Sequence, residues 1–171
     1  MYAANPEGTQ SIVEYRAYDG DPKTAAWQAS LEDGEKAIVV AAGGSRIDPD
    51  DLGGNGMGCV AIATSKGYVR FFSGTGLQRY IWRLGEEVVA MVASREMLFI
   101  VHREGGTSVD GRHKPCGGGY PVSDLSLSGC QNLRYTLIDF ENYDIVQEGR
   151  IPLQKRVTLA WIGFTTYGVS H

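Results

Sequence analysis

The stretch "GCVAIATSKGYVRFFSGTGLQRYIW" (residues 58–82) decides the fold. It contains three runs, at residues 58–64, 68–73 and 77–82, that are rich in the β-branched and aromatic residues favoured in strands. The linkers "SKG" (Ser65–Gly67) and "SGTG" (Ser73–Gly76) are short enough for hairpin turns. The stretch therefore predicts three consecutive antiparallel strands.

The same pattern extends over the rest of the chain. The one segment with a helix-friendly composition, "WQASLEDGEK", is interrupted by the turn signal Asp33-Gly34. The sequence therefore predicts an all-β protein, with further strands at residues 11–17, 25–30, 36–42, 87–93, 97–103, 132–140, 143–148 and 157–164.

The strands recur in units. "AIVVAA", "EVVAMVA" and "VTLAWIGF" each open a unit, and aligning Val39, Val89 and Leu159 gives offsets of 50 and 70 residues. Without a 28-residue insertion in the second unit, the larger offset becomes 42 residues. Four-stranded units at this period are typical of the blades of a β-propeller. The prediction is a partial propeller with two complete four-stranded blades and the first strand of a third.

This arrangement predicts which strands are buried. The first strand of each blade is expected to be covered by neighbours on both sides, with Trp161 in the core between blades. Outer strands are expected to tolerate polar residues because they meet solvent. In "YVRFFS" (residues 68–73), alternation places Arg70 and Phe72 with Tyr68 on one face, opposite Val69 and Phe71. Small residues are expected where strands converge, at Ala41, Ala42, Ala93 and Gly163.

The chain divides into two parts on this interpretation. Residues 1–35 supply lead-in strands, and residues 36–171 form the first half of the propeller. A Gly-rich insertion at residues 104–131 separates the second and third strands of the second blade, and its composition cannot bury enough apolar area to order itself. A shorter loop, residues 43–58, follows the first strand of the preceding blade.

Composition excludes several classes of protein. The net charge of −4 disfavours the basic face of a nucleic-acid-binding domain. The N-terminus lacks the basic start and apolar core of a signal peptide. The longest apolar-rich stretch, residues 88–101, is cut by Ser94, Arg95 and Glu96, so no membrane span is expected. These features predict a soluble protein.

The three cysteines do not form a convincing site. Cys59 lies in an apolar run and is expected to behave as a small hydrophobic residue. His113, Cys116 and Cys130 are three ligands at loose spacing, whereas zinc sites use about four at tight spacing. A Cys116–Cys130 disulfide stays open, but a low, odd count is typical of a reducing compartment.

No residues carry a catalytic pattern. His102 ends an apolar strand and is expected to be a structural or solvent-facing residue rather than a base, and neither His113 nor His171 lies near a nucleophile motif. Gly53–Gly58 lacks phosphate-loop spacing, and no helix follows it. Asp48–Asp51 and Asp19–Asp21 lack the alternating ligands of a calcium loop. The sequence therefore predicts no catalytic, cofactor-binding or metal-binding residues, no cofactor and no enzyme activity.

Basic residues at strand ends make DNA binding a second possible function of this segment. One group of arginines and a lysine would lie near one another at blade ends, although the flanking segments mix charge signs as ordinary exposed faces do. The group is Arg79, Arg83, Arg150, Lys155 and Arg156.

Three stretches carry a family resemblance. "ATSKGYVRFF", "YTLIDFENYDIV" and "LAWIGF" resemble the SepB-type middle β-propeller of the replisome hub family known as chromosome-transmission-fidelity or AND-type proteins. The resemblance runs from about Val13 to Gly168, and it implies half of a six-bladed propeller. Members of that family also carry WD40 repeats and, in animals, an HMG box.

The resemblance implies a nuclear scaffold without chemistry of its own. Family members form homotrimers through this propeller, couple the GINS component of the replicative helicase to DNA polymerase α–primase, and support sister-chromatid cohesion. Their partners dock on a helical bundle that has no counterpart in this chain, so no partner-binding residues carry over. The alternative functions are contact of this segment with DNA or chromatin and a generic propeller interaction module. A generic propeller with a small-molecule or enzymatic site in its channel is a further alternative, although the first strands supply almost no polar groups for such a site.

Half a ring leaves strand edges open, and open edges favour aggregation. Three solutions stay open: the chain is a piece of a longer polypeptide, it pairs with a second fragment or copy, or its edges rearrange. On the first, the hydrogen-bonding partners of residues 157–164 would lie beyond His171.

Overall fold

The computed structural model describes residues 2–4, 10–16, 26–44, 58–104, 132–140, 142–153 and 159–165. Within these ranges every regular element is a β-strand. The strands are β1 (Tyr2–Ala4), β2 (Ile12–Arg16), β3 (Ala26–Ser30), β4 (Ala37–Gly43), β5 (Cys59–Thr64), β6 (Tyr68–Ser73), β7 (Gln78–Arg83), β8 (Val88–Ser94), β9 (Met97–Arg103), β10 (Leu133–Asp139) and β11 (Ile145–Arg150).

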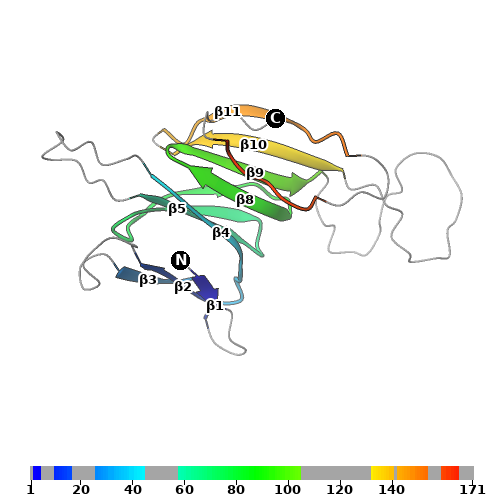
Figure 1. The fold of residues 1–171 in the computed structure, drawn as a ribbon. Helices are drawn as coiled ribbons and strands as arrows, with labels where there is room; N and C mark the ends of the chain where they lie inside the picture. Colours follow the sequence, from blue (N-terminus) through cyan, green and yellow to red (C-terminus); the bar gives the residue numbers. More distant parts are fainter. Residues whose placement is uncertain are drawn as a thin grey trace, which may run out of the picture.

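The strands form three antiparallel sheets that stack on one another (Figure 1). The first sheet has the order β1-β2-β3, the second β4-β5-β6-β7, and the third β11-β10-β9-β8. The second and third sheets are the two four-stranded blades that the sequence predicts, and the all-β prediction is confirmed. The described residues form an open stack of sheets rather than a closed ring.

The hairpins of the second sheet form where the sequence places them. Gly67 donates to the Thr64 carbonyl over 3.0 Å, and Gly76 donates to the Ser73 carbonyl over 2.9 Å. The predicted turn at Asp33-Gly34 is also present, between β3 and β4.

Two apolar clusters hold the stack together, one on each face of the second sheet. The cluster toward the third sheet contains Ala61, Phe71, Leu98, Ile100 and Ile138 among its buried members. The cluster toward the first sheet is built from Val13, Leu31, Ala37, Val60, Ile62 and Phe72. Because both of its faces are covered, β5 reads as an unbroken apolar run.

The two blades carry the same irregularity in their first strands. The register of β4 with β5 shifts between Ala37 and Val39, and that of β8 with β9 shifts between Val88 and Ala90. Ala37 and Val88 are therefore equivalent, an offset of 51 residues. The alignment of Val39 with Val89 is wrong by one residue because apolar runs do not show where a β-bulge lies.

The prediction of burial needs two corrections. The first strands β4 and β8 are partly exposed, and the interior strands β5, β6 and β9 are the most buried. Arg70 of β6 does not meet solvent as predicted for an outer strand, because β7 pairs beyond it and its guanidinium is held by a carboxylate. The predicted alternation in β6 is confirmed, since Phe71 and Phe72 enter opposite clusters.

The third-blade strand predicted at residues 157–164 is not formed over its described part. Residues 159–165 have no regular structure, and Trp161 is 79% exposed rather than packed between blades. This segment, red in Figure 1, instead contacts the third sheet through Phe164, whose ring lies edge-on to Phe99 at 6.4 Å. An apolar strand needs a neighbouring backbone to pair with, and no described strand pairs with this one.

The first sheet includes a strand that the sequence did not predict. β1 pairs with β2 in the register Ala3 to Val13, so the segment before residue 36 forms a sheet of its own that packs on the second sheet. The insertion at residues 104–131 lies between β9 and β10 as expected, but residues 105–131 fall outside the described ranges, as do residues 45–57 of the shorter loop.

Trp27 links the first and second sheets. Its ring stacks between Tyr15 and Phe72, at centroid distances of 5.6 and 5.4 Å, and its indole nitrogen donates to the Gly74 carbonyl over 3.0 Å. Gly76 has a φ of +85°, and a Cβ atom there would lie 2.7 Å from the Trp27 ring.

Substituting Gly76→Ala is therefore expected to lower the free energy of unfolding by about 2–3 kcal/mol, from the positive φ and the displaced indole together. Gly34→Ala is the matched control, because Gly34 has a φ of +72° and open space around it. It should lose only about 1 kcal/mol. Urea unfolding of the two variants measures the difference. Equal losses would show that the contact between Gly76 and the Trp27 ring does not require the absence of a side chain at residue 76.

Candidate interaction surface

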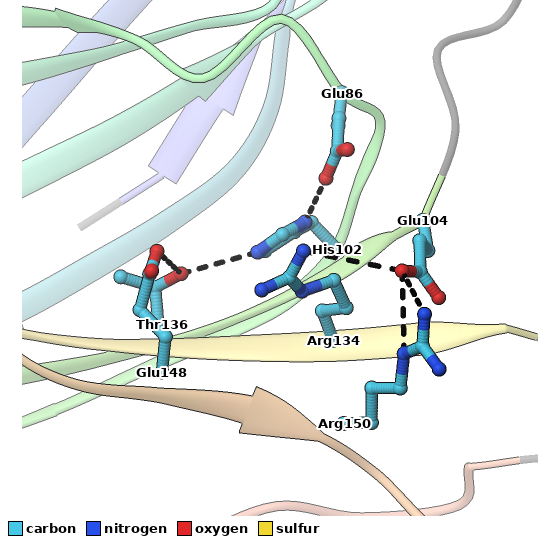
Figure 2. Close-up of polar contacts among 7 residues, drawn as sticks. All are labelled: Glu86, His102, Glu104, Arg134, Thr136, Glu148 and Arg150. Carbon is cyan, nitrogen blue, oxygen red and sulfur yellow. Dashed lines mark hydrogen bonds and ion pairs between the residues drawn. The ribbon is translucent and has the colours of Figure 1, made fainter.

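A network of hydrogen-bonded polar side chains crosses the third sheet, from the connection before β8 to β11 (Figure 2). His102 of β9 is buried, with one ring nitrogen, Nδ1, hydrogen-bonded to the Glu86 carboxylate. Its other nitrogen, Nε2, lies 3.1 Å from the Thr136 hydroxyl on β10, and that hydroxyl lies 3.3 Å from a Glu148 carboxylate oxygen on β11. An ionised carboxylate only accepts hydrogen bonds, so Nδ1 carries a proton and donates this hydrogen bond to Glu86. This network of side chains joins the connection before β8 to three successive strands, β9, β10 and β11.

A second group of charges lies at the end of the same sheet. The Glu104 carboxylate accepts from the Arg150 guanidinium over 2.6 and 3.2 Å, and the Arg134 guanidinium lies 3.9 Å away. Glu104 raises the pKa of Arg150, by hydrogen bonding and by its charge. Arg150 is exposed, so the pair holds the start of the insertion to β11 with little effect on stability.

The second sheet contains an equivalent network of polar side chains, in which an arginine takes the part that a histidine has in the third sheet. Glu35, two residues before Ala37, is buried and accepts from Arg70 Nε over 3.0 Å and from Nη2 over 2.7 Å. Arg70 also reaches Gln78 of β7 over 3.1 Å and the Glu32 carboxylate over 3.1 Å. In both blades, therefore, a glutamate of the connection before the first strand is linked through polar side chains to later strands of the same sheet, out to the outermost one.

The charge of Glu35 is stabilised by these contacts. Burial works against ionisation of Glu35, but hydrogen bonds from Arg70 and its positive charge outweigh burial and hold the pKa of Glu35 below its ordinary value. The Thr64 hydroxyl lowers this pKa too, although its contact falls outside ordinary hydrogen-bond geometry. The same pairing raises the pKa of Arg70. The pair is therefore a buried ion pair with most of its hydrogen-bonding groups satisfied.

Neither of these two networks of polar side chains resembles a catalytic centre. In each network the buried side chains, His102 and Thr136 in one and Glu35 and Arg70 in the other, are hydrogen-bonded to one another, and the terminal carboxylates of Glu148 and Glu32 reach the surface. The described residues contain no group of three His, Cys, Asp or Glu side chains that could hold a metal ion. No helix long and apolar enough to cross a membrane occurs in the described ranges.

The predicted candidate residues are separated by the fold. Of the two roles that the sequence leaves open for His102, the structure shows the structural one, and Cys59 is half-buried against the core cluster. Arg79 and Arg83 lie on β7, whereas Arg150 lies on β11 of another sheet, paired with Glu104. The other candidates, His113, His171, Cys116, Cys130, Lys155, Arg156, the two aspartate clusters and residues 53–57 of the Gly-rich loop, lie outside the described residues.

The outer strands provide the most exposed surface of the described residues. β7 and β11 are the outer edges of their sheets, and nearly every residue of each is exposed. Large apolar side chains lie there among charged ones: Leu77 just before β7, Tyr80 and Ile81 on β7, and Ile145 and Val146 on β11. Such a surface is typical of protein contacts rather than of chemistry.

The sequence analysis did not predict the two networks of polar side chains. The only signal for them was a glutamate two residues before each first strand, Glu35 and Glu86, and a single arginine within an otherwise apolar strand. Those signals gain meaning only when the register places Ala37 and Val88 in equivalent positions.

Substituting His102→Ala is expected to cost about 1–3 kcal/mol of unfolding free energy, because buried Thr136 and half-buried Glu86 each lose a partner. Arg103→Ala is the matched control on the same strand: its exposed pair with Glu87 is worth below about 1 kcal/mol. Denaturant unfolding of both variants is the measurement, and losses of similar size would contradict a structural role for His102.

Comparisons with known proteins identify the family of this chain. Residues 1–170 match the family described as "Minichromosome loss protein, Mcl1, middle region". The chain is 29% identical over 168 residues to the Arabidopsis thaliana protein ENHANCER OF LHP1 1, covering 96% of the chain and 14% of that protein.

Two animal proteins are also similar. The chain is 30% identical over 113 residues to WD repeat and HMG-box DNA-binding protein 1 of Homo sapiens, and 28% identical over 115 residues to the protein of that name from Xenopus laevis. Each alignment covers 66% of the chain and 8% of the animal protein, so the chain spans a small part of the length of these relatives. With the match extending over nearly the whole sequence, the chain belongs to the Mcl1 middle-region family.

Proposed function

We propose that this chain is part of a non-enzymatic nuclear scaffold of the replisome. In this proposal the scaffold forms a homotrimer, couples the GINS component of the replicative helicase to DNA polymerase α–primase, and supports sister-chromatid cohesion. The observation that carries it is the family match over residues 1–170, whose description names minichromosome loss. The stacked sheets support a binding role, since their buried polar side chains are hydrogen-bonded to one another and large exposed apolar side chains lie on the outer strands β7 and β11.

The test uses the full-length protein that contains this segment, tagged at its own locus. Crosslinked immunoprecipitation from replicating cells should enrich GINS and DNA polymerase α–primase, and light scattering of the purified protein should give three times the chain mass. Arrested cells should show less of both partners. A monomeric protein that enriches neither partner in replicating cells would overturn the proposal.

Direct contact with DNA is the weaker candidate function. The printed name of the human relative includes DNA binding. In this chain, however, Arg103, Arg134 and Arg150 lie beside the carboxylates of Glu87 and Glu104. We expect the isolated chain to bind a duplex weakly at low salt and with a shallow salt dependence. A steep slope, equivalent to several phosphate contacts, would favour the DNA function instead.

A further inference from the structure

The first sheet is one strand narrower than the two sheets stacked beside it. It ends at β3, whereas the second sheet continues outward to β7 and the third to β11. Trp27 of β3 stacks on Phe72 of β6, so β3 lies opposite the third strand of the second sheet. The position beyond β3 therefore lies opposite β7, and no described strand occupies it.

The face of β7 toward that position is uncovered. Ile81 is the cross-strand partner of Arg70, and Arg70 points to the side of the second sheet on which the first sheet packs. Ile81 and Arg83 share that side by alternation along the strand. Ile81 is 41% exposed there. On the opposite face, by contrast, Tyr80 stacks on Tyr143 at 5.0 Å and Trp82 packs against the core.

The charge of this position is positive. Arg83 is exposed beside Ile81, and exposed Arg79 lies at the register shift of β7. Neither arginine has an ion-pair partner within the described ranges, unlike Arg16, Arg70, Arg103, Arg134 and Arg150. The nearby carboxylates of Glu32 and Glu35 are already bound to Arg70.

The backbone of β3 offers the remaining contacts. Every residue of β3 pairs with β2 on one side, so half of its N–H and C=O groups point to the other side, where no described strand lies. An added strand gains main-chain hydrogen bonds at such an edge, and its alternate side chains give specificity.

We infer that the edge of β3 and the outer face of β7 form a docking site for an extended acidic segment of a partner protein. The segment adds to β3 as the fourth strand of the first sheet. Its apolar side chains cover Ile81, and its carboxylates pair with Arg83 and Arg79. The inference stands on β3 and β7 and is independent of the replication role proposed above.

The probe is a capped seven-residue peptide, Val-Thr-Glu-Thr-Val-Thr-Glu, whose alternation places valine and glutamate together on one face of the strand, and the same peptide with lysine in place of glutamate is its counterpart. The full 171-residue chain should bind the glutamate peptide about tenfold more tightly at low salt. Hydrogen exchange should show slower exchange of the amides of residues 26–30 with this peptide bound. Binding without that protection, or equal binding of both peptides, would overturn the inference.

Two variants locate the site. Ile81→Lys should weaken binding of the glutamate peptide about tenfold, and Arg83→Glu should reverse the preference toward the lysine peptide. Ile145→Lys on β11 is the matched control, since Ile145 is exposed to a similar degree as Ile81 but lies on another sheet, and it should leave binding unchanged. Equal loss in all three variants would overturn the site.

Two other occupants have distinct signatures. Protection of residues 26–30 that appears without peptide and grows with protein concentration would assign the edge to a second copy. Displacement of the glutamate peptide by duplex DNA, with protection of the same amides, would assign it to nucleic acid. Either result would overturn an acidic partner segment.

Discussion

Replacing Arg70 with methionine is expected to lower the free energy of unfolding by about 3–5 kcal/mol. Glu35 is 1% exposed, and Arg70 supplies both of its strong hydrogen bonds. Removing the guanidinium leaves a carboxylate buried between two sheets without a counter-charge. Equilibrium unfolding in urea at neutral pH measures the loss.

Two controls separate the ion pair from the loss of packing. Arg83→Met removes an exposed arginine from the same side of the same sheet and should change stability by less than about 0.5 kcal/mol. The double variant Arg70→Met with Glu35→Met should recover most of the loss, because no charge is then left buried. A double variant as unstable as Arg70→Met alone would show that the arginine stem, not the charge, is what matters.

The same pair gives stability a defined pH dependence. Because the pKa of Glu35 is held below its ordinary value of 4.5, the pair stabilises the folded state fully above about pH 4.5. This contribution is lost as pH falls through the lower, folded-state pKa. Glu35→Gln should therefore differ most from the parent at neutral pH and converge with it in acid. A constant difference from about pH 3 to pH 7 would contradict the assignment.

Substituting Phe71→Ala is expected to cost about 3–5 kcal/mol. Phe71 is 1% exposed at the junction of the second and third sheets, and its ring contacts Tyr80, Phe140 and Tyr143 at centroid distances of 6.0, 6.0 and 5.3 Å. Its loss opens a cavity between sheets that are held mainly by apolar contact. Calorimetry or urea unfolding is the measurement.

Tyr80→Phe is the matched control for this cavity, since it keeps the ring stacked on Tyr143 and removes only the hydroxyl group of a residue that is 43% exposed. Its expected change is below about 0.5 kcal/mol. If Phe71→Ala lost no more than this, the two blades would not depend on their shared core, and the stacking of sheets would need another explanation.

The sequence predicted most of the strands because each depends on local information. Short Gly-containing turns and alternating apolar residues specify a hairpin wherever it lies, so β5, β6 and β7 agree with prediction to within one residue. β1 was missed because three residues are too few to show alternation. The strand at residues 157–164 was predicted from composition, but pairing requires a neighbour, and the described part of that segment has none.

The two networks of polar side chains could not be predicted, because they depend on the register in which the strands pair. Glu35 and Arg70 are 35 residues apart, and His102 and Thr136 are 34 apart across the insertion. A shift of one residue would turn each of these side chains to the other face of its sheet. A buried arginine also contradicts the expectation that charged residues lie outside, and only its partner explains it.

By itself, the sequence determined that this chain is an all-β repeat protein and placed its hairpins, since strand periodicity and turn chemistry act between near neighbours. Tertiary structure decided which strands are interior, where the two glutamates of the connections find their partners, and which edges stay open. Those outcomes depend on how whole sheets stack and in which register, and stacking brings together residues that no local pattern connects.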